Sequence, residues 1–317
     1  MKFINNVLTF LLLLTILNSV YATQSRCNGM QSRPCIVQDT VDNSPVVRQW
    51  RDSQMMMQAY KDVGDVTGLA NLWMSGSAMP GAAGWGTIHN NIMQASQHKI
   101  KQIIDVDLRQ ESHGYLNDNA ITLAVKYDWI NRGKTHAQAL NSEQHWLQYL
   151  SKQSRISLLT DEQFDEGDFS DGEMVTVKSI RNEAEVVRRA GFGYMRLTVT
   201  DHMAPDDDEV DRFVHFTKTL LPQTWVHFHC RGGKGRTATF MVMFDMLHNA
   251  DKVSFDNIAK RQAAVAPYYD VTKVARGKPE LTPYYQQRLE FLKDFYQFSY
   301  DSLHGYAGTW TEWKSKS

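Results

Sequence analysis

The stretch that decides the fold is residues 224–244, TWVHFHCRGGKGRTATFMVMF. Its β-branched and aromatic start predicts a strand that ends at Cys230, and its apolar second half predicts a helix over 237–247. The turn between them holds three glycines, Gly232, Gly233 and Gly235. Glycines let backbone N–H groups converge on one point, and the start of a helix adds partial positive charge there. The turn is therefore expected to bind an anion.

The polar side chains of this turn suit phosphate chemistry. We expect Cys230 to be a thiolate, because the N–H groups and the helix start favour the charged form, which attacks phosphorus. Arg236 offers a planar fork that fits two phosphoryl oxygens. We expect Thr237 to donate its hydroxyl to the departing sulfur and His229 to orient the loop backbone. The alternative is a structural turn around a buried, inert cysteine.

The spacing of these residues narrows the choice. A Walker-type nucleotide loop does not fit, since Lys234 is followed by Gly235 and not by Ser or Thr. Five residues separate Cys230 from Arg236, so the loop resembles the HCxxGxxR(S/T) signature of cysteine-dependent phosphatases. Further stretches are similar to the bacterial protein-tyrosine-phosphatase-like inositol phosphatases, the cysteine phytases: Trp73–Ser77, Val106–Gly114, Thr200–His202 and Phe228–Leu247. The likeness covers about residues 45–315 and is weakest over 115–190.

The resemblance implies an α/β fold with a central twisted, mostly parallel sheet flanked by helices and a small inserted subdomain. The alternation of short apolar runs with helical segments also favours a parallel sheet. The implied activity is removal of phosphates from inositol polyphosphates such as phytate through a phosphocysteine, without metal or cofactor. The alternatives are a protein tyrosine, dual-specificity or phosphoinositide phosphatase, and a catalytically inactive phosphate-binding module.

The resemblance also assigns the general acid. In this family it is the Asp of a Thr-Asp-His motif, here Asp201, with His202 beside the substrate. A poor alkoxide leaving group needs a proton, and the same carboxylate can later activate water. The acidic run Asp206–Asp208 competes for this role. We favour Asp201 because it directly follows a predicted strand, whereas the run is typical of a solvated helix start.

Outer substrate contacts are expected at several basic and aromatic residues. Local alignment with the family selects Tyr285 and Arg288, and Arg51 is a candidate on the predicted N-terminal arm. For each of them, the alternative is an ordinary exposed residue on the surface. Arg231 and Lys234 depart from the acidic and apolar residues of the phytase-like loops and resemble the loops of phosphoinositide phosphatases. Two added cations favour a multiply charged substrate.

Composition and the first residues bound the remaining possibilities. The 317 residues carry a net charge of −1, so nothing suggests a nucleic-acid partner, and the oligomeric state stays open. Lys2, the apolar run 7–17 and the small residues Val20 and Ala22 predict a signal peptide over residues 1–22, hence a secreted or periplasmic protein without a stable membrane anchor. An uncleaved anchor helix is the alternative.

The rest of the chain is expected to have three parts. We predict an extended N-terminal arm over 23–65 and a phosphatase domain over 66–317, with the inserted subdomain at about 113–180. Cys27 and Cys35 are candidates for a disulfide, although spacing alone leaves this open. No zinc site is expected, because His227 and His229 lie two apart on a strand without a Cys or His cluster at ligand spacing.

Overall fold

The structure, a computed structural model, describes residues 27–40 and 44–316. The predicted signal peptide therefore lies outside the described residues. Within them, no helix has the length and apolar character needed to cross a membrane.

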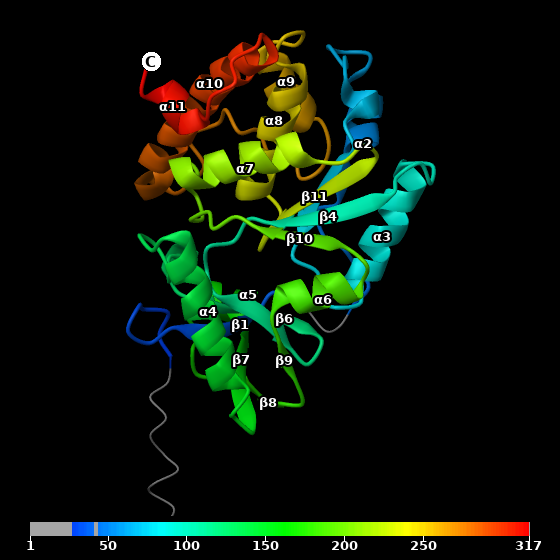
Figure 1. Ribbon diagram of the computed structural model, residues 1–317. Helices are drawn as coiled ribbons and strands as arrows, with labels where there is room; N and C mark the ends of the chain where they lie inside the picture. Colours follow the sequence, from blue (N-terminus) through cyan, green and yellow to red (C-terminus); the bar gives the residue numbers. More distant parts are fainter. Residues whose placement is uncertain (1–26, 41–43, 317) are drawn as a thin grey trace, which may run out of the picture.

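A five-stranded sheet forms the centre of the molecule (Figure 1). All neighbouring pairs are parallel except the short edge pair β2–β3, which confirms the mostly parallel sheet. The strands, in spatial order, are β10 (Gly193–Arg196), β4 (Gln102–Asp107), β11 (Thr224–Cys230), β3 (Met74–Ala78) and β2 (Arg51–Asp52).

Helices cover both faces of this sheet, as Figure 1 shows. One face carries α2 (Ser53–Tyr60), α7 (Asp207–Thr219), α8 (Gly235–Asn249), α9 (Phe255–Gln262), α10 (Thr282–Leu303) and α11 (Trp310–Lys314). The other face carries α3 (Gly84–Ala95) and α6 (Glu183–Arg189). Short 3-10 turns occur at η1 (Leu69–Asn71), η2 (Lys126–Asp128) and η3 (Pro279–Leu281).

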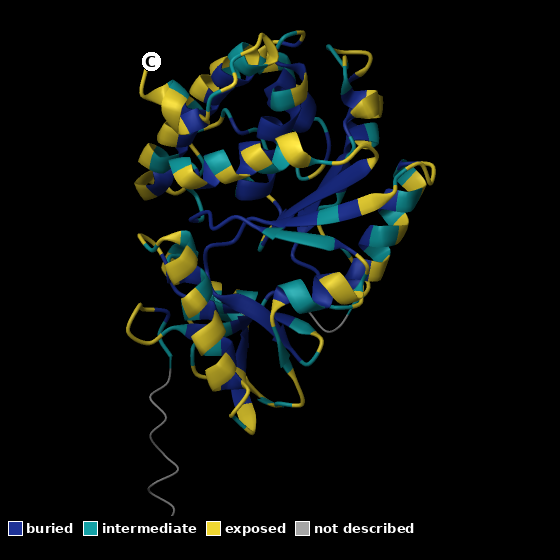
Figure 2. Ribbon diagram, in the orientation of Figure 1, coloured by how far each residue is buried: buried dark blue, intermediate teal, exposed yellow. Residues whose placement is uncertain are grey.

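The central strand β11 is buried along its whole length (Figure 2). Because side chains alternate along a strand, Phe228 and Cys230 point into the core under α8, whereas Trp225 and His229 point toward α3. A strand covered on both faces reads as a continuous apolar and aromatic run, which is why residues 224–230 could be recognised.

A second, six-stranded sheet lies beside the first. Its strands, in spatial order, are β8 (Glu173–Thr176), β7 (Arg155–Thr160), β1 (Cys35–Gln38), β6 (Asn119–Ala124), β5 (His113–Leu116) and β9 (Ile180–Arg181). The helices α4 (His136–Leu150) and α5 (Asp161–Glu166) accompany it.

This sheet corrects the prediction of an extended arm over 23–65. Residues 35–38 form an inner strand, held between β6 and β7, and residues 51–60 form β2 and α2. Cys35 and Val37 are fully buried in the second sheet's core, and Cys35 is joined to Cys27 by a disulfide. A four-residue strand has too short an alternation to be recognised in sequence. The segment 113–180 is consequently completed by a strand from outside it.

Candidate active site

The thiol of Cys230 lies at the carboxyl end of β11, at the entrance to the glycine-rich loop. It is 3% exposed, and the Thr237 hydroxyl donates a hydrogen bond to its sulfur over 3.2 Å. Thr237 belongs to the first turn of α8, so the loop brings a strand end and a helix start together. This contact is the one expected for stabilising a sulfur leaving group.

The backbone of the loop is held from outside. The carbonyls of Cys230 and Arg231 accept bonds from the Met79 N–H, and the carbonyl of Gly233 accepts one from Arg51. Because the C=O and N–H of a trans peptide point in opposite directions, the N–H groups that follow these carbonyls face the loop's interior. Gly233 has φ +65°, and a Cβ there would lie 2.3 Å from the Ala78 nitrogen, so only glycine fits.

Arg236 is fixed in place by a carboxylate that the sequence reasoning did not single out. Its Nη1 and Nη2 donate to the two oxygens of Glu111 at 2.5 and 2.9 Å. Burial by itself raises the pKa of Glu111, but Arg236 and Arg109 outweigh it and hold that pKa well below its usual range. Glu111 lies within the quoted stretch Val106–Gly114, so the family resemblance contained the signal.

Asp201 is adjacent to this arginine. Its Oδ1 lies 3.0 Å from Arg236 Nε and its Oδ2 lies 3.2 Å from His202 Nε2, with the carboxyl side chain 22% exposed. Trp129 Nε1 donates to the Asp201 carbonyl over 3.0 Å. The competing Asp207 instead pairs with Lys314 and accepts from Trp310 Nε1, which holds α11 on α7. The geometry therefore favours Asp201 as the acid.

The outer candidates gather around the same centre. The Tyr285 hydroxyl bonds with His202 Nδ1 over 3.0 Å, and burial lowers the pKa of His202. Arg288 is 1% exposed, donates to Tyr269 and lies so close to the loop that a Cβ on Gly235 would be 3.2 Å from its Nη1. A simple surface role for Tyr285 and Arg288 is thus excluded by their burial.

Arg51 is also buried, at 1% exposure, and lies beneath the loop. Its Nη1 donates to the carbonyl of Gly233 over 2.9 Å. Burial lowers the pKa of Arg51 to about 10, against the opposing effect of the Cys230 sulfur. Arg51 therefore supports the loop by binding its backbone and adds a positive charge beneath it.

The two loop cations differ from each other, which corrects one expectation. Arg231 was expected to bind the substrate, but its guanidinium is occupied by carboxylates. It pairs with Asp39 at 2.9 Å, with Asp128 at 2.8 Å and with Asp161. Three aspartates compensate its charge, because the second sheet brings them to the loop. Lys234, by contrast, is exposed at the N-cap of α8.

His229 also differs from its expected role. Strand alternation turns its ring away from the loop, and Nε2 forms ion pairs with Glu183 Oε1 at 2.6 Å and Asp105 Oδ2 at 3.3 Å. It therefore contacts carboxylates and not the loop backbone.

The same cluster revises the reasoning about metal ligands. Two overlapping trios, Asp105–Glu183–His229 and Asp107–His113–Glu183, each bring their ligand atoms within 4.8 Å of one another. Residues far apart in sequence form them, so ligand spacing gave no signal. Ion pairs among these carboxylates, the two imidazoles and Arg196 account for the cluster.

Comparisons with known proteins agree with this fold and site. A model of PTP-like phytases, described by the words "Inositol hexakisphosphate", matches residues 106–248. The PTP-like phytase from Bdellovibrio bacteriovorus is 32% identical, with a TM-score of 0.70 over 88% of this chain and 94% of that one. The tandemly repeated protein tyrosine phosphatase like phytase from Mitsuokella multacida is 28% identical, with a TM-score of 0.78 over 94% of this chain and 51% of that one.

Among curated proteins, the effector protein hopD2 of Pseudomonas syringae pv. tomato is 32% identical over 214 residues, 67% of this chain and 46% of that protein. The chain thus spans about half the length of hopD2 and of the Mitsuokella protein. The loop and the parallel sheet define a protein of the tyrosine-phosphatase-like class. Within that class, the chain belongs to the PTP-like phytase family.

Proposed function

We propose that this chain is a cysteine-dependent phosphomonoester hydrolase whose substrates are myo-inositol polyphosphates. The observation that carries the proposal is the convergence of Cys230, Arg236 and Asp201 at one loop, with Thr237 on the sulfur and Glu111 on the arginine. These groups supply a nucleophile, a phosphoryl clamp and an acid.

The reaction follows from this arrangement in two steps. The Cys230 thiolate attacks phosphorus, Arg236 and the loop N–H groups hold the equatorial oxygens, and Asp201 protonates the departing alkoxide. Water, deprotonated by Asp201, then cleaves the phosphocysteine, and Thr237 stabilises the returning thiolate. The Arg236–Asp201 contact has to open for the phosphoryl group to enter the fork. All chemistry in this proposal comes from side chains, without a metal.

Inositol polyphosphates are supported by the family and by the surroundings of the loop. A PTP-like myo-inositol phosphatase from Mitsuokella multacida, 28% identical, has been solved in complex with myo-inositol-(1,3,4,5)-tetrakisphosphate. In this chain the cations Arg51 and Arg288 adjoin the loop and Lys234 is exposed on it. Several cations around one phosphate site favour a substrate with several phosphates.

The test is phosphate release from inositol hexakisphosphate and from a phosphotyrosine peptide, side by side, with a chelator present. We expect preference for the inositol substrate, loss of turnover in Cys230→Ser, and a fall of about 10²–10⁴-fold in kcat for Asp201→Asn. Asp208→Asn, an exposed neighbour, is the matched control. Preference for the peptide would contradict the proposed substrate class and leave the mechanism in place. Wild-type rates in Cys230→Ser would contradict the mechanism.

We also propose that the protein is exported after removal of residues 1–22. The leader-like sequence and the Cys27–Cys35 disulfide support this, because disulfides persist in oxidising compartments. Sequencing the N-terminus of the protein recovered outside the cytoplasm should give Thr23. An intact residue 1 on the exported or membrane-bound protein would contradict the proposal.

A further inference from the structure

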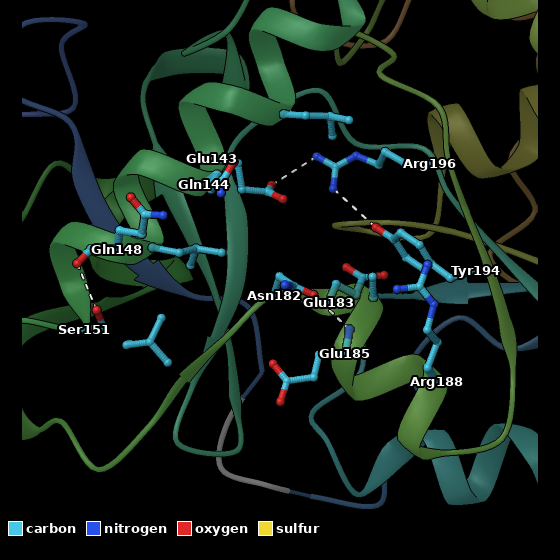
Figure 3. A pocket seen from close by; sticks show the side chains of 14 residues that line it. Glu143, Gln144, Gln148, Ser151, Asn182, Glu183, Glu185, Arg188, Tyr194 and Arg196 are labelled. Atoms are coloured by element: carbon cyan, nitrogen blue, oxygen red, sulfur yellow. Dashed lines mark hydrogen bonds and ion pairs between the residues drawn. The ribbon is translucent and has the colours of Figure 1, made fainter.

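Glu183 is a fully buried carboxylate between two histidines. Its Oε1 lies 2.6 Å from His229 Nε2, and its Oε2 accepts a hydrogen bond from His113 Nε2 over 2.8 Å. It is one of the residues that line a pocket of about 530 Å³ formed by residues of α4, α6 and β10. Figure 3 shows Glu183 among the side chains around this pocket. The mechanism described above makes no use of it.

Each of the two histidines is adjacent to a different part of the site. His229 directly precedes the nucleophile Cys230 on β11. His113 Nδ1 donates to the backbone carbonyl of Glu111 over 2.8 Å, and the Glu111 side chain clamps Arg236. One carboxylate thus contacts the supports of both the nucleophile and the phosphoryl clamp.

The charges around Glu183 favour imidazolium at both histidines. Burial lowers the pKa of His229, but Glu183 and Asp105 raise it well above its usual range. For His113 the carboxylates of Asp107 and Glu143 outweigh burial and nearby arginines and raise the pKa to about 9. The charged and titratable groups around Glu183, His113 and His229 are Asp105 and Asp107 on β4, Arg109, Tyr115 on β5, Glu143 on α4, Tyr194 and Arg196 on β10, and His227 on β11.

The surroundings favour a positive charge on His229 and a neutral ring on the histidine stacked beside it. His227 lies with its ring 6.4 Å from that of His229, and burial together with His229 and Arg51 holds its pKa well below the usual range. Its two nitrogens bond with the hydroxyls of Ser75 and Ser77, which suit a neutral ring. Of these two histidines, His229 is therefore the one that carries positive charge, and it directly precedes the thiol in sequence.

We infer that Glu183 is a positioning residue for the proposed phosphatase reaction: it keeps a positive charge on His229 beside Cys230 and holds His113 beneath the Glu111–Arg236 clamp. The side chains of His229 and Cys230 lie on opposite faces of β11, so this fixed cation acts on the thiol across the strand without direct contact, and it favours the thiolate. The inference rests on the proposed function only in treating this thiolate as the nucleophile of the phosphatase reaction. The positioning itself can be measured without a substrate.

The experiment is the pH dependence of Cys230 alkylation by iodoacetamide in the folded wild type and in Glu183→Gln. Cys230 is the free thiol of the chain, because Cys27 and Cys35 are paired, so the alkylation rate reports this sulfur alone. The variant keeps the shape of the side chain and removes its charge. We expect the midpoint pH of alkylation to rise by roughly one unit.

A second readout separates the two arms of Glu183. Inorganic phosphate in the loop protects the thiol, and Glu183→Gln is expected to need a several-fold higher phosphate concentration for half-protection. His229→Asn, which removes the imidazole next to Cys230 and leaves the Glu183–His113 bond in place, is expected to raise the midpoint without this loss. In a His229→Asn background, Glu183→Gln should add no further midpoint shift, since the effect passes through His229.

Glu185→Gln is the matched control, because Glu185 lines the same pocket two residues on and pairs with Arg189. A folded Glu183→Gln with the midpoint of the control overturns the inference, even if its melting temperature falls. If that variant does not fold, His229→Asn decides, and an unshifted midpoint there contradicts the inference, because the effect of Glu183 is to pass through His229. A wild type that is readily alkylated but releases no phosphate from inositol phosphates would overturn the proposed function alone.

Discussion

At the scale of single residues, the site depends on short contacts between side chains, most of them from residues that are not neighbours in sequence. Thr237 reaches the Cys230 sulfur because the glycine loop folds the start of α8 back over the end of β11. Lys234 stays exposed on the same loop, while Arg236 is buried. Residues that are neighbours in sequence therefore have different roles, and single substitutions should affect different steps of the proposed reaction.

Thr237→Val should slow the second half of the reaction. The valine keeps the volume of threonine and removes the hydroxyl that bonds to sulfur, so the thiolate is a poorer leaving group. A hydrogen bond to a charged group contributes about 1.5–3 kcal/mol, which corresponds to roughly a ten- to hundred-fold slower hydrolysis of phosphocysteine. Rapid-quench measurement should show a burst of leaving group followed by slow turnover. Thr237→Ser, which keeps the hydroxyl, should behave as wild type.

Lys234→Ala should weaken binding of highly phosphorylated substrates. An exposed cation acts through a screened attraction of at most about 1 kcal/mol, so we expect roughly a five-fold higher KM for inositol hexakisphosphate. The KM for a simple aryl phosphate should change much less, and added salt should shrink the difference. Lys260→Ala, an exposed lysine on α9, is the control. Equal changes with both substrates would assign Lys234 to the first phosphate instead.

At the scale of elements, Arg231 joins the loop to the second sheet. Its three aspartate partners come from the end of β1, from η2 and from the start of α5. Burial raises the pKa of Asp128 to about 6, although Arg231 opposes this. The loop is therefore supported by elements that are remote from it in sequence.

Arg231→Met should destabilise the protein by about 3 kcal/mol, because it removes the cation paired with the buried carboxylate of Asp128. Asp39 keeps its pair with Arg109, and the Asp161 side chain is partly exposed. Loss of the cation raises the pKa of Asp128 further, so the folded state takes up a proton and stability falls as pH rises. The loss should thus be larger at pH 8 than at pH 5, measured by denaturant unfolding. Arg188→Met on α6, an exposed arginine, should change little. A pH-independent loss would show that packing and not charge is responsible.

At the scale of the whole molecule, a buried ionic cluster lies where strands of both sheets meet α6. β4, β10 and β11 of the first sheet and β5 of the second contribute to it. Burial raises the pKa of Asp105 to about 7, and carboxylates raise that of His113 to about 9. Both groups bind a proton more tightly in the folded state than in the unfolded chain.

Stability should therefore decrease between about pH 6.5 and pH 9. The pKa of His113 is near 6.5 when unfolded and about 9 when folded, so its contribution is complete below pH 6.5 and is lost as pH rises through 9. Thermal unfolding across this range should show the decline. In His113→Gln the decline should be shallower, even though the variant is less stable throughout. An unchanged slope would show that His113 does not titrate on unfolding.

The local sequence determined the features that depend on neighbouring residues. The strand 224–230, the glycine turn and the helix after it could be predicted, because a doubly buried strand, an αL glycine and an apolar helix each leave a local pattern. The proposed nucleophile, phosphoryl-binding arginine and general acid followed from that turn and from the family resemblance.

Only the tertiary structure decided which charges reach that turn. The inner position of β1, the three aspartates on Arg231, the clamp of Glu111 on Arg236 and the carboxylates on His229 all join residues that are distant in sequence. Sheet order and strand alternation place these partners, and neither periodicity nor ligand spacing encodes which strands become neighbours. The sequence thus specified the groups proposed to react, and the packing of two sheets specified their electrostatic surroundings.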